Sequence, residues 1–323
     1  MTSGGGGNGG GAASLPLLDL LCCPDDRAAP LVPDGDDLVC PKCARRYPVS
    51  DGMVSVLSAQ HLSEQDGLER RDRDVEASWY DAMFEGYTNA VEVPAGVRRI
   101  GRPSGVILDA GCGTGRITEA LLPLGQPIVA VDYSEPTIRL MQARIKGTPV
   151  PVLAIQSDLR ALPLRDGVIA ATTCIEVYAQ LRPADRRTFL GELHRVMRPG
   201  AVLSMSAYNY NLMFKAWRRL GNGMAREGQH MLGGEYYFAR LTREDYRREL
   251  ERLFDVEELT GIRNIPARTL AGGLRKVRLR RAGDRFLDFM VARGRRADFA
   301  LERLPAVAGL VGFFWQARAR RRA

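Results

Sequence analysis

Short apolar runs alternate with amphipathic stretches along most of this chain of 323 residues. An apolar run bounded by turn residues indicates a buried strand, whereas apolar residues three and four positions apart indicate a helix packed on a core. The pattern predicts strands at 106–108, 126–131, 151–155, 168–173, 201–207, 256–265 and 310–317, and helices at 117–124, 136–146, 185–197 and from Thr242. This alternation is typical of an α/β fold.

The sharpest local signal is the stretch from Val106 to Arg116, where an apolar run ends at an acid and then breaks into glycines. Gly111 and Gly113 free the backbone and leave no Cβ in the way, so a nucleotide-like ligand can lie against the main chain at a helix N-terminus. The dinucleotide pattern G-x-G-x-x-G would need a glycine at Arg116. The spacing therefore disfavours a nicotinamide cofactor.

Five motifs follow one another in a fixed order: LDAGCGTG, VAVDYS, SDLRALPL, CIEVYAQL and LHRVMRPGAVLSMS. Together they resemble the class I S-adenosylmethionine-dependent methyltransferases, closest to the branch that includes the quinone-biosynthesis methyltransferases, over roughly residues 75–265. The resemblance implies a Rossmann-like sheet of seven strands with helices on both faces. It also implies S-adenosylmethionine as the methyl donor.

The motifs also suggest which residues bind the donor. Asp132 lies about 20 residues past the glycines, where an acid can accept both hydroxyl groups of a ribose. By resemblance Tyr133 lines the adenine, Asp158 accepts from the adenine amino group and Leu159 packs on the ring. The complete predicted donor site consists of Asp109, Gly111, Cys112, Gly113, Asp132, Tyr133, Asp158, Leu159 and Cys174.

No catalytic residue is assigned from the sequence. Family members often carry Glu-His-Leu after the fourth strand, but here the residues are Ala179, Gln180 and Leu181, so a histidine base is absent. Three residues are hypotheses for proton removal from an acceptor: Glu176, Tyr178 and Tyr208. Aromatic residues recur at helical spacing over 79–87; Tyr80 and Tyr87 either wall the donor or belong to a core-facing helix. The aromatic stretch 208–237 is a candidate lid over the acceptor.

The chain divides into a disordered glycine-rich tail (1–15), a small β-rich domain (16–57), a polar linker (58–74) and a methyltransferase domain (75–323). In the small domain, CCPDD and CPKC are joined by a hairpin with strands at 30–32 and 38–39. This domain resembles the zinc-ribbon-like domain of activator proteins of tRNA methyltransferases.

The small domain has two possible sources of stability. Zinc would be held by Cys23, Asp26, Cys40 and Cys43, or by Cys22 in place of the acid. Alternatively, a metal-free ribbon would be held together by its apolar residues and by packing on the larger domain. Those apolar residues are Leu18, Leu21, Leu38, Tyr47, Val49 and Val54.

The net charge of +8 is unevenly distributed. Residues 240–323 hold 21 Lys and Arg against 11 Asp and Glu, so the rest of the chain carries about −2. The basic insertion 266–303 is amphipathic. We expect it to pack on its own domain, with a membrane surface or a lipid-like acceptor as the alternative. The six cysteines do not suggest a disulfide framework, and no signal peptide or transmembrane segment is recognisable, which favours a cytoplasmic location.

Three functions compete on this evidence. The first is methyl transfer from S-adenosylmethionine to a small-molecule or lipid-like acceptor. The second is methylation of RNA, because some ribosomal RNA methyltransferases combine a zinc module with this fold. The third is a non-catalytic binding partner that retains the fold. The complete set Asp109, Gly111, Gly113, Asp132 and Asp158 speaks against the third. The oligomeric state is not predicted.

Overall fold

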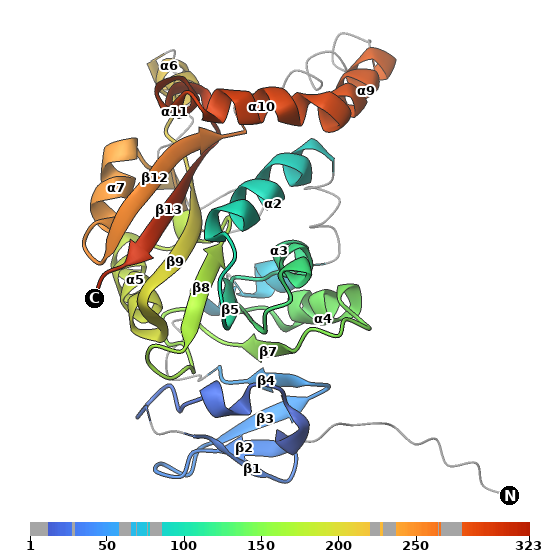
Figure 1. Cartoon of the computed structure of the whole chain (residues 1–323), viewed down its shortest axis with the longest axis vertical. Coiled ribbons are helices and arrows are strands. Elements are labelled where there is room, and N and C mark those ends of the chain that lie inside the picture. The colour runs from blue at the N-terminus through green and yellow to red at the C-terminus, as the bar shows by residue number, and fades with distance from the viewer. Residues whose placement is uncertain are drawn as a thin grey trace, which may run out of the picture.

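A single sheet of eleven strands runs through the computed structural model (Figure 1). The structure describes residues 12–27, 30–57, 66–68, 70–75, 77, 86–219, 227–228, 237–263, 265 and 280–323. The order of the strands is β1-β2-β3-β4-β7-β6-β5-β8-β9-β13-β12, and a further pair, β10 and β11, stands apart.

Seven strands form the central part of the sheet: β7 (Val152–Gln156), β6 (Ile128–Asp132), β5 (Ile107–Ala110), β8 (Ile169–Cys174), β9 (Met197–Tyr208), β13 (Phe314–Arg321) and β12 (Phe254–Ile262). The first five are parallel, whereas β13 is antiparallel to both β9 and β12. From β5 the chain adds β6 and β7 on one side, and it then crosses over to add β8 and β9 on the other side of β5. The direction in which strands are added therefore reverses between β5 and β8. The predicted seven-stranded sheet is confirmed, and the reversal marks where ligands bind in such sheets.

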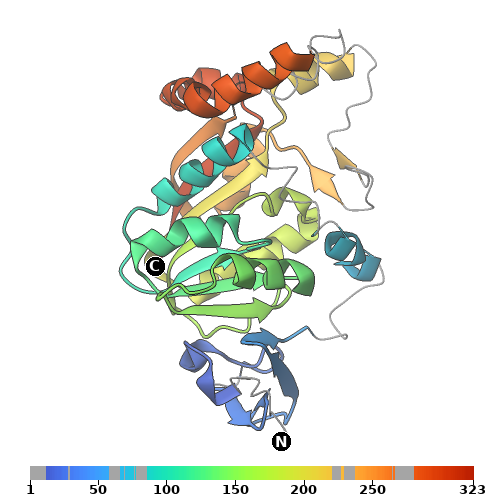
Figure 2. The same cartoon turned by 90° about the vertical axis from the view of Figure 1, so that its right-hand side faces the viewer.

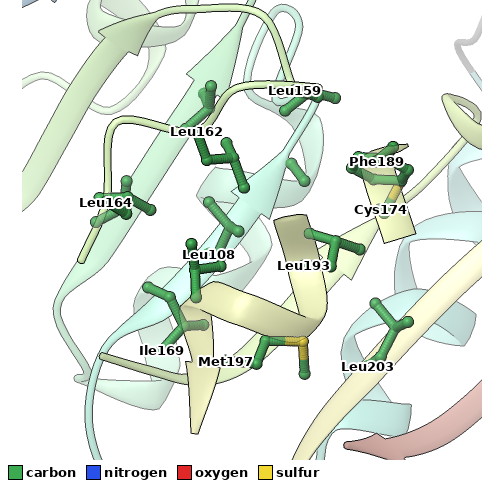
Figure 3. Close-up of a cluster of buried hydrophobic side chains, with 14 of the residues drawn as sticks. Leu108, Leu159, Leu162, Leu164, Ile169, Cys174, Phe189, Leu193, Met197 and Leu203 are labelled. Carbon is green, nitrogen blue, oxygen red and sulfur yellow. The ribbon is translucent and has the colours of Figure 1, made fainter. Parts of the chain in front are cut away.

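Helices cover both faces of this sheet, as expected. On one face, Leu108 of β5 packs with residues of α5 (Pro183–Val196) and α7 (Arg243–Leu250). Figure 3 shows part of this core, in which Phe189 and Leu193 of α5 belong to the same cluster as Leu108 and Leu203. On the other face, α2 (Tyr87–Ile100), α3 (Arg116–Leu121) and α4 (Glu135–Arg144) pack on alternate residues of the same strands. The strands are buried on both faces, which explains why they read as continuous apolar runs.

The N-terminal strands extend the central sheet rather than forming a separate one. They are β1 (Val32–Asp34), β2 (Asp37–Val39), β3 (Arg46–Ser50) and β4 (Met53–Ser55), preceded by short 3₁₀ turns η1 (Ala12–Ser14) and η2 (Leu18–Leu20). The pairs β1–β2, β2–β3 and β3–β4 are antiparallel, and β4 pairs in parallel with β7. Ser55 Oγ donates to Gln156 Oε1 across that pair at 2.8 Å. The β-rich small domain is confirmed and is seated edge to edge on the larger one (Figures 1 and 2).

Other contacts, beside the strand pair, also fasten the small domain. Leu21 forms an antiparallel bridge with Leu164, and Arg27 pairs with Glu192 of α5 at 3.0 Å. The apolar residues predicted to hold the ribbon belong to the main core, with Leu21, Leu38, Tyr47 and Val54 buried in it. The packing-based source of stability is therefore present.

Two predicted elements differ from the observed ones. The helix at 185–197 begins at Pro183 and ends at Val196, after which β9 runs on through Pro199 and Gly200. The predicted final strand 310–317 is divided, because α11 (Pro305–Val311) includes Leu310 and β13 begins only at Phe314. A Cβ at Gly261 of β12 would overlap the Ala308 carbonyl, so α11 packs directly on that glycine.

The basic insertion is helical where it is described. It comprises α9 (Arg280–Phe289), a π-helical segment η6 (Met290–Gly294) and α10 (Arg295–Glu302), while residues 266–279 lie outside the described residues. The stretch 208–237 contributes α6 (Leu212–Arg219) and β10 (Glu227–Gly228), and β11 (Phe238–Ala239) follows it directly. Its residues 220–226 and 229–236 lie outside the described residues. Tyr80 lies outside them too, as does the side chain of Tyr87 at the start of α2. No helix in the described ranges is long and apolar enough to cross a bilayer.

Candidate functional site

The glycine turn after β5 adopts backbone angles that suit glycine. Gly111, Gly113 and Gly115 have φ angles of +79°, +50° and +87°. A Cβ at Gly111 would overlap Cγ2 of Val177, and a Cβ at Gly115 would lie 2.6 Å from Cγ of Met141. A Cβ at Gly113 would meet nothing within 4 Å. Gly111 and Gly115 are therefore needed for close packing, whereas Gly113 faces open space in which a ligand can lie.

A pocket opens beside this turn, along the carboxyl ends of β7, β6, β5 and β8. Of the predicted donor residues, Gly111, Gly113, Asp132, Tyr133, Asp158 and Leu159 line it. Its wall is completed by Asp66, Arg73, Thr137, Arg160, Ile175, Glu176, Val177, Gln180, Leu181, Arg182 and Asp185. The structure thus brings together six predicted residues that are spread over 49 positions of the sequence.

Asp132 is held rigidly at the end of β6. Its Oδ1 accepts from the backbone N–H groups of Tyr133 at 2.7 Å and Ser134 at 3.0 Å, and its Oδ2 accepts from the N–H of Gly113 at 2.8 Å. Three main-chain donors therefore fix the orientation of the carboxylate and tie it to the glycine turn. A carboxylate held in this way is prepared to accept hydrogen bonds from paired hydroxyl groups.

Asp158 has a partner that the sequence did not reveal. Arg160 donates from Nε and Nη2 to its carboxylate at 2.6 to 3.0 Å, and also pairs with Asp185 at 3.0 Å and Asp66 at 3.1 Å. One guanidinium group thus links three carboxylates at the β7 end of the pocket. These contacts raise the pKa of Arg160, so it stays charged and fixes Asp158 in place.

Residues 66–75, the end of the predicted linker, contribute directly to the site. They are helical where described, and this short helix is seen beside the body of the molecule in Figure 2. Tyr133 donates its hydroxyl hydrogen to the Asp66 carbonyl at 3.3 Å, Ser134 Oγ donates to Asp74 at 2.6 Å, and Arg73 donates to Gln180 at 2.7 Å. The segment therefore covers one side of the pocket. This part of the sequence is polar and contains no motif, so the sequence did not indicate that it lines the pocket.

Three predicted donor residues do not line the pocket. Asp109 is buried behind it and accepts from Thr118 Oγ1 at 2.7 Å and from Thr173 Oγ1 at 3.0 Å. Burial raises the pKa of Asp109 to about 6, against the lowering effect of these two hydrogen bonds. Cys112 and Cys174 are also buried, which raises the pKa of both thiols. These residues support the turn and the strand ends from behind.

Of the three hypothetical bases, only Glu176 lines the pocket. It follows β8 with a φ angle of +62°, which is strained for a residue with a side chain, and it is 4% exposed. Burial and the neighbouring Glu92 raise its pKa, and Arg263 lies 3.8 Å from its Oε1. Tyr178 is fully buried with its hydroxyl donating to Glu249, and the ring of Tyr208 packs on Phe314.

The two knuckles of the small domain bring four possible metal ligands together. One ligand atom from each of Cys23, Asp26, Cys40 and Cys43 lies within 4.8 Å of all the others. The Sγ atoms of Cys23 and Cys43 are 3.8 Å apart, which equals the edge of about 3.8 Å expected for a tetrahedron with Zn–S bonds of about 2.3 Å. The backbone N–H groups of Lys42 and Cys43 point at Cys40 Sγ. These residues fit a zinc ion, and Cys22 is not part of the group.

Two family models match this chain. Residues 107–200 match a methyltransferase domain, and residues 14–52 match the Trm112p-like proteins. The chain contains a Trm112p-like domain followed in sequence by a methyltransferase domain. The methyltransferase match begins at β5 and ends within β9, so it spans the four strand ends that form the pocket. Both parts of the predicted resemblance are confirmed.

The methyltransferase domain has curated relatives. It is 31% identical to a demethylmenaquinone methyltransferase of Thermus thermophilus over 99 residues, which are 30% of this chain and 44% of that protein. It is 28% identical to a carboxy-S-adenosyl-L-methionine synthase of Hydrogenovibrio crunogenus over 111 residues, which are 32% of this chain and 43% of that protein. The chain thus spans less than half the length of these relatives.

Solved structures show the same fold. The 1,6-didemethyltoxoflavin-N1-methyltransferase of Burkholderia thailandensis matches with a TM-score of 0.54 and 15% identity over 88% of this chain and 98% of that chain. A complex of the Haloferax volcanii Trm112 methyltransferase activator and a methyltransferase matches with a TM-score of 0.51 and 16% identity over 79% of this chain and 97% of that chain. At this identity the likeness supports the fold of the methyltransferase domain and no finer statement.

Proposed function

We propose that this protein binds S-adenosylmethionine and transfers its methyl group to a small-molecule or lipid-like acceptor. The observation that carries the proposal is the carboxylate of Asp132, which three backbone N–H groups hold beside the open space at Gly113. This carboxylate lies in a pocket of a methyltransferase domain, at the strand ends where such sheets bind nucleotides.

The order of the strand ends sets how the donor would lie. Asp158, Leu159 and Tyr133 would bind the adenine near β7, and Asp132 would accept from the ribose hydroxyls at β6. The methionine part, with the sulfonium, then falls over β5 and β8, near Gly111 and Glu176. The remaining predicted residues, Asp109, Cys112 and Cys174, would act by supporting these positions from below.

In the transfer step, the lone pair of an acceptor atom attacks the methyl carbon while the S–CH₃ bond breaks and leaves its electron pair on sulfur. Because the sulfonium is already activated, the protein contributes mainly alignment and exclusion of water. An O–H or N–H acceptor must also lose a proton. We propose the Glu176 carboxylate as its recipient, because its side chain is buried and lines the pocket, and its pKa is raised.

RNA is the second candidate acceptor. The Trm112p-like match and the excess of arginine in the C-terminal third both favour it. A non-catalytic role is the third candidate, and the intact pocket speaks against it. Zinc bound by Cys23, Asp26, Cys40 and Cys43 would stabilise the small domain and takes no part in the transfer.

The test begins with donor binding. Calorimetry with S-adenosylmethionine compares the wild-type protein with Asp132→Asn, which keeps the shape of the side chain, and with Asp36→Asn, an exposed control in the small domain. Loss of two charge-assisted hydrogen bonds should weaken binding roughly a hundredfold or more in Asp132→Asn only. Transfer of labelled methyl groups into lipid, RNA and small-molecule fractions then identifies the acceptor class. A folded wild-type protein that fails to bind the donor would refute the enzymatic proposal.

A further inference from the structure

The helices of the basic insertion lie at the end of the molecule remote from the Trm112p-like domain (Figure 1). Their inner side is packed: Phe286, Met290 and Phe299 surround Val91 of α2. The expectation that the insertion packs on its own domain is therefore met on this side. The outer side of this end of the molecule is formed by α9, η6 and α10 of the insertion and by α11, which follows them in the chain and contacts α6.

The outer side exposes large apolar side chains. Eleven large hydrophobic residues are exposed among those the structure describes, and six of them lie here: Leu212, Phe289, Leu304, Val307, Leu310 and Val311. Leu304, Leu310 and Phe289 are 55%, 52% and 53% exposed. Along α11 the exposed residues recur three and four positions apart, so they form one face. Such a concentration marks a binding surface.

The same side is positively charged. Six arginines are exposed on it: Arg281, Arg285, Arg293, Arg295, Arg296 and Arg303. Within the described part of the chain, none of these six forms an ion pair. The acids of these helices offset this charge only in part, because Asp298 and Glu302 are buried on the inner side, Asp284 is half-buried and Asp288 is exposed. We call these arginines and the six apolar residues the arginine–apolar face.

A hollow between α6 and α11 combines both properties. Its apolar part is lined by Leu212, Pro305, Ala306 and Leu310, and its polar part by Lys215 and Arg243 together with Asn209, Asn211 and Thr242. Apolar walls beside two cationic side chains match the chemistry of an acyl chain next to a phosphate group.

We propose that the arginine–apolar face docks on the surface of a membrane that contains anionic phospholipids. Apolar side chains would enter the acyl boundary while arginines pair with lipid phosphates, as in interfacial amphipathic helices. Nucleic acid would use the arginines but would leave six large apolar side chains unburied, so a bilayer fits the whole face better. Docking does not require the proposed methyl transfer. Once docked, the protein would receive a lipid-like acceptor along α2, which carries Glu92 next to Glu176 of the pocket. Only this consequence rests on the proposed methyl transfer.

The test is flotation of the full-length protein with vesicles of phosphatidylcholine alone or with phosphatidylglycerol added. The apolar variant is Phe289→Ser with Leu304→Ser and Leu310→Ser, matched by Leu140→Ser, a 43% exposed residue on α4. The charge variant replaces Arg281, Arg285, Arg295 and Arg296 by Gln. It is matched by Gln at four arginines that are exposed elsewhere, Arg102, Arg165, Arg187 and Arg252. All these side chains are exposed, so the variants should fold, and circular dichroism checks that they do.

We expect binding to the anionic vesicles only, unaffected by both control variants. Binding should fall in the apolar variant, and in the charge variant by roughly a factor of five for each arginine removed. Three results would overturn the proposal: no binding to anionic vesicles, binding that survives both variants, or a stable dimer in solution that the apolar variant dissociates. Tight binding of an RNA oligonucleotide that the charge variant alone abolishes, with no vesicle binding, would assign the face to RNA. Donor binding measured on the same samples keeps this result separate from the proposed function.

Discussion

The contact between Gly111 and Val177 allows a quantitative test of how the pocket is built. Replacing Gly111 by Ala places a Cβ against Cγ2 of Val177 at a φ angle of +79°. The left-handed backbone conformation costs about 1–2 kcal/mol with a side chain, and the steric overlap should cost a further 1–3 kcal/mol, roughly. We therefore expect Gly111→Ala to lower the free energy of unfolding by about 2–5 kcal/mol.

Two glycines separate these contributions. Gly113 and Gly125 also have positive φ angles, of +50° and +66°, but a Cβ at either would meet nothing within 4 Å. Ala at each should cost only the backbone term of about 1–2 kcal/mol. Gly125 ends η4 (Leu122–Leu124), away from the pocket, so its variant should keep donor affinity, whereas Gly113→Ala should lose it.

A double-mutant cycle isolates the overlap. Val177→Ala removes the clashing methyl group and should by itself cost about 1 kcal/mol. With the methyl gone, Gly111→Ala should cost about 1–3 kcal/mol less than in the wild-type background. Urea denaturation followed by circular dichroism measures all four proteins. Additive effects, within about 0.5 kcal/mol, would show that the Val177 contact does not require the glycine and would refute the reasoning.

Three further predictions address individual acidic residues. Because burial raises the pKa of Asp109 to about 6, the contribution of this residue to stability should fall by about 2 kcal/mol as pH rises from 4 to 7. The free energy of unfolding of the wild type should therefore fall by about 2 kcal/mol relative to that of Asp109→Asn over this range, and parallel pH profiles would contradict the prediction. Glu176→Gln should stabilise the protein at pH 8 by about 1 kcal/mol or more, since it removes a carboxyl whose pKa is raised by burial and by Glu92, whereas a less stable variant would make Glu176 a structural ion-pair partner. Asp26→Cys should tighten zinc binding in a chelator competition, because it completes a second Cys-x-x-Cys pair, and unchanged affinity would exclude Asp26 as a ligand.

The sequence was most informative where one stretch of residues determines the structure. β5, β6, β7 and β8 lie within about two residues of their predicted positions, because strands buried on both faces must be apolar throughout. Asp132 stands at the end of its strand, as its spacing from the glycines indicated. Thr242 accepts from the Asp245 N–H at 3.1 Å and caps α7.

What could not be predicted depends on contacts between distant residues. Asp66 lines the pocket only because its segment is held by distant residues: Asp66 pairs with Arg160 and Asp74 accepts from Ser134, each more than 50 positions away. The apolar run before Phe314 suits a helix or a strand equally, and packing of α11 on Gly261 decides it. Asp109 belongs to the glycine motif but is directed behind the pocket, where Thr118 and Thr173 bind it.

The pairing of β4 with β7 has a consequence for how this protein can be produced and divided. Without the first 57 residues, β7 would become an edge strand with a row of unpaired backbone N–H and C=O groups, and Leu164 would lose its cover. Open edges of this kind invite pairing with other chains. A truncated methyltransferase domain should therefore aggregate on expression, and adding the separate small domain should restore its solubility. The N-terminal segment thus acts as a permanently attached solubility partner for the catalytic sheet.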